Sequence, residues 1–421
     1  MTSISITGAR TRVVLRWGIG LTIVAAIVTS LPRLAAQDAY EPPPKFTTTA
    51  LLGPAGVKGP QYQVEEPVRT EQYFHEFTIT STYGSFEAVG RTQLAARIQE
   101  IGALAALDDV SKTEVFLSAA GQSVVNVGKG AAAAVKDPAA TVKGLGAGVK
   151  RFGVNLGRRT ERATTADSTS AGGGSAAGSA ASSVLGVNAA LRRWAQKVGV
   201  DPYTTNAVLR EALNDIAKVD AAGSIATKVV VPIPGVVGLT STVGAIVWGK
   251  DPEEVRKLNE QTLRALGVPE AVAKTLFSNQ WFTLTYQTRL MTALGAVNVP
   301  GVADYVESAA GAASEREALF FVESAEMLQE WHARERVLRV LTDSRALVAT
   351  VAGGRARALL PLDWVRWTAE TQKALLQVAA RARQELKATR LEIVLTGRAS
   401  ERALLEIPKV GWTVVPAEVK R

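Results

Sequence analysis

The sequence contains no cysteine and only two histidines, His75 and His332. The lack of cysteine excludes disulfide bonds, a thiol nucleophile, a thiolate metal site and a lipid-modified N-terminal cysteine. Two histidines are too few for a histidine-rich zinc or di-iron centre. The sequence therefore predicts no metal site and no cofactor, and any attachment to a membrane has to be non-covalent.

Recognisable catalytic motifs are also missing. The sequence has no Gly-x-Ser-x-Gly nucleophile elbow, and a Ser-His-Asp arrangement would have to use one of the two histidines. No catalytic residue is predicted. A hydrolase without a standard motif stays open as an alternative, and it would draw on dispersed carboxylates such as Asp304, Glu307 and Asp363.

The first 36 residues have the layout of a secretory signal peptide. Three arginines precede a largely apolar run from Trp17 to Leu31, and two alanines follow it at 35 and 36. The run is shorter than the roughly 20 residues that a membrane-spanning helix needs. We expect cleavage near Ala36 and export to the periplasm, the cell envelope or the extracellular space.

Positive charge is concentrated in one short segment. Residues 121–162 carry eight basic and two acidic side chains, a net charge of +6, whereas residues 37–120 have a net charge of −5. Four lysines of this glycine-rich segment recur at seven-residue intervals, which places those on each helix along one side. Asp137-Pro138 is a helix start, so two helices are expected to meet there.

This basic segment predicts one of two arrangements. The first is a helical hairpin with a solvated lysine edge, and the second is a pair of interfacial helices on an anionic lipid or an envelope polymer. Nucleic acid is not an expected partner, because almost no aromatic residue is available for base stacking. The predicted contact residues are Lys129, Lys136, Lys143, Lys150, Arg151, Arg158 and Arg159.

Composition divides the chain into six parts. The signal peptide, residues 1–36, is followed by a Pro-rich disordered leader, residues 37–70. Residues 71–163 combine a β-hairpin near Tyr83-Gly84 with an amphipathic helix and the basic segment. A Gly/Ala/Ser/Thr-rich linker, residues 164–183, precedes a helical domain over 184–341 and a small α/β module over 342–421.

The helical domain contains one uncharged stretch, Val229 to Gly249, interrupted by Pro232-Ile-Pro-Gly235. Neither half is long enough to span a bilayer, so burial in the core is expected. Shallow insertion into a membrane by a secreted effector stays open as an alternative. A capping box at Ser314 opens a helix that is expected to extend as far as Leu341.

In the C-terminal module the order of elements is strand, strand, helix, strand, helix, strand, which predicts some parallel pairing. Thr396-Gly397 follows a predicted strand, at the place where α/β sheets carry ligand loops, and we expect a simple tight turn there. Several acidic residues of the preceding helix, including Glu323, Glu326 and Glu330, lie beside arginines. This pattern favours a solvent-facing, salt-bridged surface over a metal site.

A weak pattern over residues 73–157 is similar to one found in uncharacterised exported bacterial proteins. It consists of Tyr83-Gly-Ser-Phe86, Leu94, Arg97-Ile98, Glu100-Ile101, Leu107-Asp108 and Asp137-Pro138. The resemblance implies no activity and no site residue.

Together these patterns predict a mainly α fold, with a helical body, a small N-terminal β-hairpin and a C-terminal α/β module. The expected function is that of a non-enzymatic, exported, envelope-associated structural or interaction protein that contacts an anionic surface.

Overall fold

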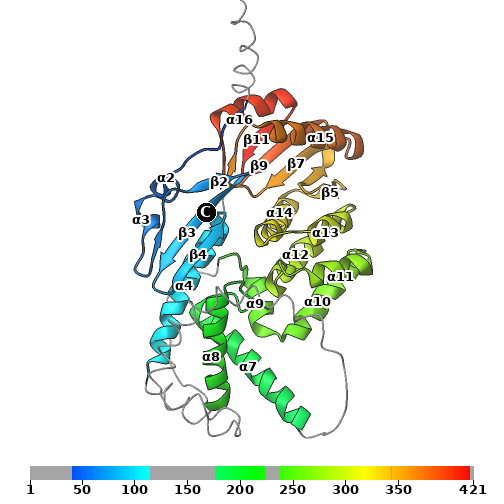
Figure 1. Ribbon diagram of the computed structural model, residues 1–421. Helices are drawn as coiled ribbons and strands as arrows, with labels where there is room; N and C mark the ends of the chain where they lie inside the picture. The colour runs from blue at the N-terminus through cyan, green and yellow to red at the C-terminus, as the bar shows by residue number, and fades with distance from the viewer. Residues whose placement is uncertain (1–39, 114–175, 224–236, 343, 418–421) are drawn as a thin grey trace, which may run out of the picture. The chain divides into compact units, whose positions relative to one another are not determined.

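The computed structural model describes residues 40–113, 176–223, 237–342 and 344–417 (Figure 1). The chain divides into two units, Met1–Pro42 and Pro43–Arg421, and the second contains all the helices and strands of the described residues. The predicted signal peptide and all seven predicted contact residues, Lys129 to Arg159, lie outside the described residues.

An antiparallel sheet of four strands begins the second unit. The predicted hairpin is confirmed: β3 (Phe74–Ser81) pairs with β4 (Gly84–Val89) across a turn at Gly84. On its other edge, β3 pairs with β1 (Tyr62–Val64) and β2 (Arg69–Glu71). These two strands, with α2 (Thr48–Leu52) and α3 (Pro54–Val57), come mostly from the segment expected to be a disordered leader.

Helix α4 (Arg91–Ser111) follows the hairpin and packs on β4, α7 and α8. Its apolar residues recur at three- and four-residue steps, so that Leu94, Ile101 and Leu104 share the core with Trp194 of α7. The other helices of this middle region are α7 (Ala176–Val198), α8 (Ala207–Gly223), α9 (Ser241–Gly249), α10 (Pro252–Ala265), α11 (Glu270–Ser278), α12 (Leu284–Val297), α13 (Val302–Ala310) and α14 (Glu315–Arg334). No helix among the described residues is both long and apolar enough to cross a membrane.

A mixed sheet of five strands, in the order β11-β9-β7-β6-β5, forms the C-terminal region. The strands β7, β9 and β11 are parallel, whereas β5 and β6 are antiparallel to their neighbours. Their bounds are β5 (Val337–Val340), β6 (Leu347–Val351), β7 (Arg355–Leu360), β9 (Arg390–Leu395) and β11 (Thr413–Pro416). The parallel crossovers contain α15 (Ala369–Glu385) and α16 (Glu401–Glu406).

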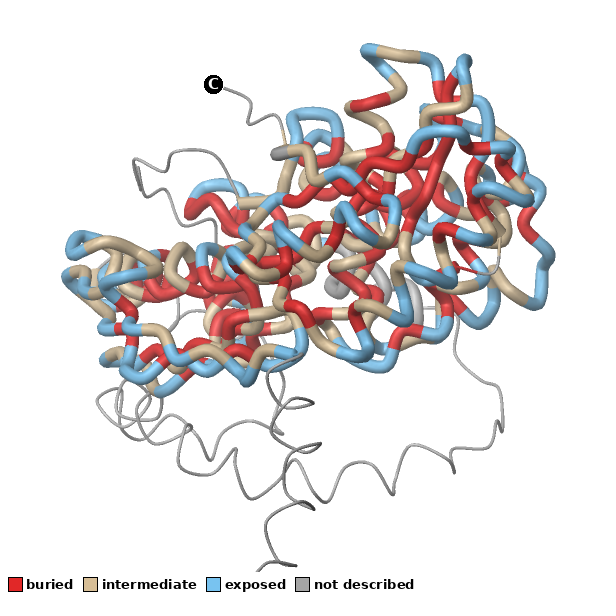
Figure 2. Tube along the Cα trace, turned by 90° about the horizontal axis from the view of Figure 1, so that it is seen from above, coloured by how far each residue is buried: buried red, intermediate tan, exposed pale blue. Residues whose placement is uncertain are grey.

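This sheet lies between two helical layers, with α15 and α16 on one face and α14 on the other (Figure 1). Because side chains alternate along a strand, Leu391, Ile393 and Leu395 face α15 and α16, whereas Leu359 and Val394 pack in the core that contains α14. In Figure 2 the exposed residues lie mainly on the outer helices and loops. Burial on both faces explains why β6, with the sequence LVATV, is almost wholly apolar.

The prediction of a mainly α fold with one small hairpin is wrong. The described residues form three sheets, of five, four and two strands, so the protein is an α/β mix. Strands β1, β2, β8 (Trp364–Val365) and β10 (Arg398–Ala399) have only two or three residues, too few to show an alternating pattern. The helix expected to reach Leu341 ends at Arg334, and β5 follows.

Gly397 lies where two strand-following loops touch. A Cβ atom at this position would be 2.2 Å from the carbonyl oxygen of Asp363 and 2.4 Å from that of Leu362. Both neighbours are backbone atoms, which cannot move aside as a flexible side chain can. Only glycine therefore allows this approach of the two loops.

We predict that Gly397→Ala lowers the free energy of unfolding by about 1 to 3 kcal/mol, because the added methyl group forces the loops apart. The matched control is Gly102→Ala, at an exposed position of α4 where a Cβ meets no other atom. That variant should gain up to about 1 kcal/mol from helix propensity. Urea unfolding followed by tryptophan fluorescence measures both, and equal effects would contradict the packing argument.

Candidate functional site

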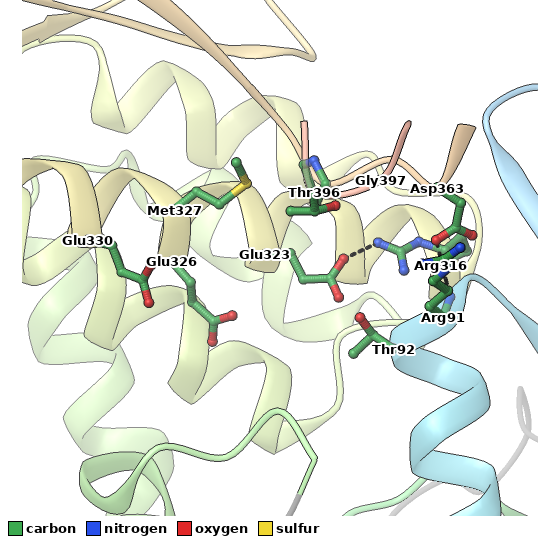
Figure 3. A pocket seen from close by; sticks show the side chains of 11 residues that line it. Arg91, Thr92, Arg316, Glu323, Glu326, Met327, Glu330, Asp363, Thr396 and Gly397 are labelled. Atoms are coloured by element: carbon green, nitrogen blue, oxygen red, sulfur yellow. Dashed lines mark hydrogen bonds and ion pairs between the residues drawn. The ribbon is translucent and has the colours of Figure 1, made fainter. Parts of the chain in front are cut away.

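A polar cavity of about 320 Å³ lies where three distant parts of the chain meet. It is bounded by the start of α4, by one face of α14 and by the loops that follow β7 and β9 (Figure 3). We call it the polar pocket. Its lining consists of Arg91, Thr92, Arg316, Glu323, Glu326, Met327, Glu330, Pro361, Asp363, Thr396 and Gly397.

The loops that follow β7 and β9 form one wall of the polar pocket. Strands β7 and β9 are parallel and in register, so that Leu360 lies beside Leu395 at their carboxyl ends. The residues that follow each strand, Pro361 and Thr396 among them, line the pocket. Ligands of α/β proteins commonly bind at this edge of the sheet. The sequence predicts only a tight turn at Thr396-Gly397, whereas in the structure both residues also form part of the pocket wall.

A single face of α14 forms the opposite wall. Arg316, Glu323, Glu326 and Glu330 follow one another at steps of seven, three and four residues, which is the repeat of one helix face. Ser314 caps this helix, and its hydroxyl oxygen accepts a hydrogen bond from the Glu317 backbone N–H at 3.1 Å. The capping box found in the sequence thus fixes where the charged face begins.

The glutamates of this face do not form the solvent-facing surface predicted from the sequence. They are partly buried in the polar pocket, where Glu323 is paired with Arg316 of the same helix and Glu326 with an arginine of another helix. Glu326 accepts two hydrogen bonds of 2.8 Å from the guanidinium of Arg289 on α12. Burial lowers the pKa of Arg289, but the Glu326 carboxylate raises it by more, so the pKa lies above its ordinary value. The predicted salt bridges are present for Glu323 and Glu326, but their partners are Arg316 and Arg289 and not the arginines that follow them in sequence.

Arg316 is the most enclosed cation of the polar pocket, with 8% of its side chain exposed. Its Nη2 donates to Glu323, and its guanidinium carbon lies 4.5 Å from the centre of the Phe74 ring. Its Nε is buried and has no acceptor. Gly90, at φ +92°, lets the guanidinium approach the start of α4, because a Cβ there would lie 3.0 Å from Nη1.

Asp363 connects the loop that follows β7 with β3 and with the start of α4. Its Oδ2 accepts the backbone N–H of His75 at 3.0 Å, and its Oδ1 accepts that of Arg91 at 3.3 Å. The N-cap of α4 is Gly90, which has no side chain, so this distant carboxylate serves the first turn of the helix. Arg91 itself has an exposed side chain that forms no ion pair with any described residue.

A second cavity, of about 50 Å³, lies next to the first and shares Thr92 with it. Arg97 donates to Glu100 at 2.8 Å and to Glu315 at 3.3 Å, and the Tyr286 hydroxyl donates to Glu315 at 3.0 Å. The lining also includes Asp201, whose Oδ1 accepts hydrogen bonds from Thr285 and from a backbone N–H. This network joins α4, α12 and α14 through groups that satisfy one another.

The structure does not bring together the carboxylates suggested for a hydrolase. Asp363 lines the polar pocket, whereas Asp304 and Glu307 lie on α13 and line neither cavity. His75 is fully buried, with its ring 5.2 Å from that of Phe46. Among the described residues, no three His, Asp or Glu side chains are grouped to hold a metal ion.

No sequence pattern indicated Arg91 or Arg316 as pocket residues. Two sequence features could have indicated the pocket: the position of Thr396-Gly397 directly after a strand, and the spacing of the glutamates on α14. Comparison with models of protein families, with curated proteins and with solved structures finds no match for this chain. Function therefore has to be inferred from the chemistry of the site.

Asp201 makes stability depend on pH. Burial raises the pKa of its carboxyl group from 3.8 to about 6, against the opposing effect of the hydrogen bond from Thr285. The folded chain therefore holds this proton at pH values where the unfolded chain has released it. The free energy of unfolding should fall by up to about 3 kcal/mol as the pH rises from 4 to 6.

We predict that Asp201→Asn removes this pH dependence of the free energy of unfolding. The amide is neutral at every pH in the range, and its oxygen still accepts both hydrogen bonds. Urea unfolding at several pH values measures it, as the difference between wild type and variant. Asp215→Asn, at an exposed position of α8, is the control and should follow the wild type. Parallel pH curves for wild type and Asp201→Asn would contradict the prediction.

Proposed function

We propose that the chain is an exported, non-enzymatic binding protein of the cell envelope whose polar pocket holds a small charged molecule. The observation that carries this proposal is the wall of the pocket, where six charged side chains from three distant segments surround one cavity of about 320 Å³. This volume lies at the lower end of the range for small-molecule sites.

The pocket is held in shape by its own contacts. Glu323 is paired with Arg316, Glu326 with Arg289, and Asp363 with two backbone N–H groups. Side chains held in this way lose little further freedom when a ligand arrives, which favours affinity. The same contacts argue against acid–base catalysis, because a general acid or base has to exchange its proton with a substrate.

A pocket-filling variant tests the proposal. Thr396 is exposed at the mouth of the pocket, so Thr396→Trp should fill the entrance without disturbing the core. We expect at least one member of a panel of amino acids, short peptides, hydroxy acids and sugars to raise the melting temperature of the wild type, because a bound ligand stabilises the folded state. The variant should lose this shift.

The control is Thr242→Trp, at an exposed position of α9 away from both cavities. It should respond to the panel as the wild type does. A panel without effect on the wild type would refute the proposal, and so would a shift that survives in Thr396→Trp.

A second candidate function concerns the basic segment, residues 121–162. Its net charge of +6 suits an anionic lipid or an envelope polymer. Replacing Lys129, Lys136, Lys143 and Lys150 with glutamine should release the mature protein from anionic vesicles at low salt, since each lysine near such a surface contributes about 1 kcal/mol. Unchanged sedimentation with the vesicles would exclude this function.

A further inference from the structure

Exposed leucines gather on the helices that cover the outer face of the five-stranded sheet. Five large hydrophobic side chains are exposed in the described region, and three of them, Leu376, Leu404 and Leu405, belong to α15 and α16. Leu405 is the most exposed of the five, at 68%. Single exposed leucines are common on proteins, whereas a group of them on neighbouring elements marks an interaction surface.

The two helices present these leucines on one surface. Both connect parallel strands of the same sheet, and Ala382 of α15 shares a buried cluster with Ala403 and Ile407. The side chains opposite this cluster therefore point outward, on the side of the sheet away from α14 (Figure 1). We call this surface the α15/α16 face. It consists of the exposed residues of α15, α16 and the short helix η3 (Ile407–Val410), together with Lys387.

Cations flank the exposed leucine of α15. Lys373, Leu376 and Arg383 lie at steps of three and seven residues, which places them on one side of the helix, and Lys387 continues this spacing just beyond its end. A Cβ atom on Gly411, the C-cap of η3, would lie 2.5 Å from Nη2 of Arg383. Leu376 is therefore on the side of α15 next to η3, which directly follows the leucines of α16.

Positive charge is in excess on the α15/α16 face and beside it. Four cations there form no ion pair with any described residue, and they are Lys373, Arg383, Lys387 and Arg402. The exposed acids of the face are Glu370 and Glu401. Leucines surrounded by basic side chains are typical of helices that lie on anionic lipid, because the leucines enter the headgroup region while the cations meet phosphates.

The size and the charge of the face favour a lipid surface over a protein partner. The helices α15, α16 and η3 together expose fourteen residues, whereas a stable protein interface takes about 20 to 30 from each side. A second copy of the chain would also bring like charges together across a two-fold axis. A membrane requires no complementary shape, because each leucine and each cation contributes by itself.

We infer that the α15/α16 face is a docking surface for an anionic lipid membrane. None of its residues lines either cavity, so the inference goes beyond the proposed ligand of the polar pocket. It also assigns the contact to residues other than those of the basic segment.

The lack of cysteine allows a probe to be placed on the face itself. Leu405→Cys introduces a single thiol for a polarity-sensitive fluorophore, and Thr242→Cys places the same probe on an exposed position of α9 as the control. Vesicles of phosphatidylglycerol and phosphatidylcholine in equal parts are added to the full chain. The emission at position 405 should shift to shorter wavelength, because this side chain enters the headgroup region. Vesicles of phosphatidylcholine alone, and the probe at position 242, should give no shift.

Two double variants separate the effects of charge and of apolar contact. Lys373→Gln with Arg383→Gln should weaken sedimentation with the anionic vesicles about 25-fold at low salt, because each cation near such a surface contributes about fivefold. Leu376→Gln with Leu405→Gln should weaken it about tenfold at low and high salt alike, because salt does not screen apolar contact. All four side chains are exposed, so the fold should be unchanged, which circular dichroism checks.

The matched controls alter exposed residues elsewhere. Arg69→Gln with Arg264→Gln removes two exposed cations, and Leu338→Gln removes an exposed leucine of β5. Both should sediment with the vesicles as the wild type does.

The local probe distinguishes this inference from the other proposals. No shift at position 405 overturns it even where the full chain sediments with vesicles, because residues 121–162 would then account for the binding. A dimer that Leu405→Gln abolishes, in the absence of a shift on vesicles, would assign the face to a second copy and also overturn it. A ligand panel without effect refutes the proposed function of the pocket and leaves this inference standing.

Discussion

The carboxylate of Asp363 is the contact on which the arrangement of the described region depends. It accepts a hydrogen bond from a backbone N–H of β3 and another from the first residue of α4, almost 300 positions earlier in the chain. The backbone N–H groups of Asp363 and Trp364 in turn donate to the Tyr73 carbonyl oxygen at 3.1 and 3.0 Å. A buried charge that is bonded in this way stabilises the junction, whereas removing its partners would leave it uncompensated. These hydrogen bonds therefore fix the position of the N-terminal sheet relative to the loop that follows β7.

The same junction explains why charged side chains are concentrated at the polar pocket. Three segments that meet through backbone ends cannot fill the space between them with apolar side chains alone, because the helix start and the strand ends bring unpaired polar groups with them. Arg316 and Glu323 neutralise each other, and Arg289 neutralises Glu326 from the far side of α14. The buried Nε of Arg316 is left without an acceptor. The polarity of the pocket is thus a consequence of how the fold is assembled.

The sequence predicted the elements whose patterns are local. The alternation around β3, the cap of α14, and the apolar runs of β6, β7 and β9 all correspond to elements in the structure. It did not predict β1 and β2, which exist through pairing with β3, or the early end of α14, which is set by β5 joining the sheet. The pocket was beyond local reasoning for the same reason, since Arg91 and Arg316 are 225 positions apart and Asp363 is farther still. Contacts of that range leave no periodic trace in a sequence.

The two cavities are physically connected through Arg289 and Thr92. The Arg289 guanidinium lines the inner cavity and is also the partner of Glu326 in the polar pocket, while Thr92 borders both. Burial has the larger effect on the pKa of Asp201 in the inner cavity and raises it, whereas the charge of Arg289 also acts on that carboxyl group and lowers its pKa. The inner network, which joins α4, α12 and α14, is therefore linked to the wall of the pocket through one guanidinium.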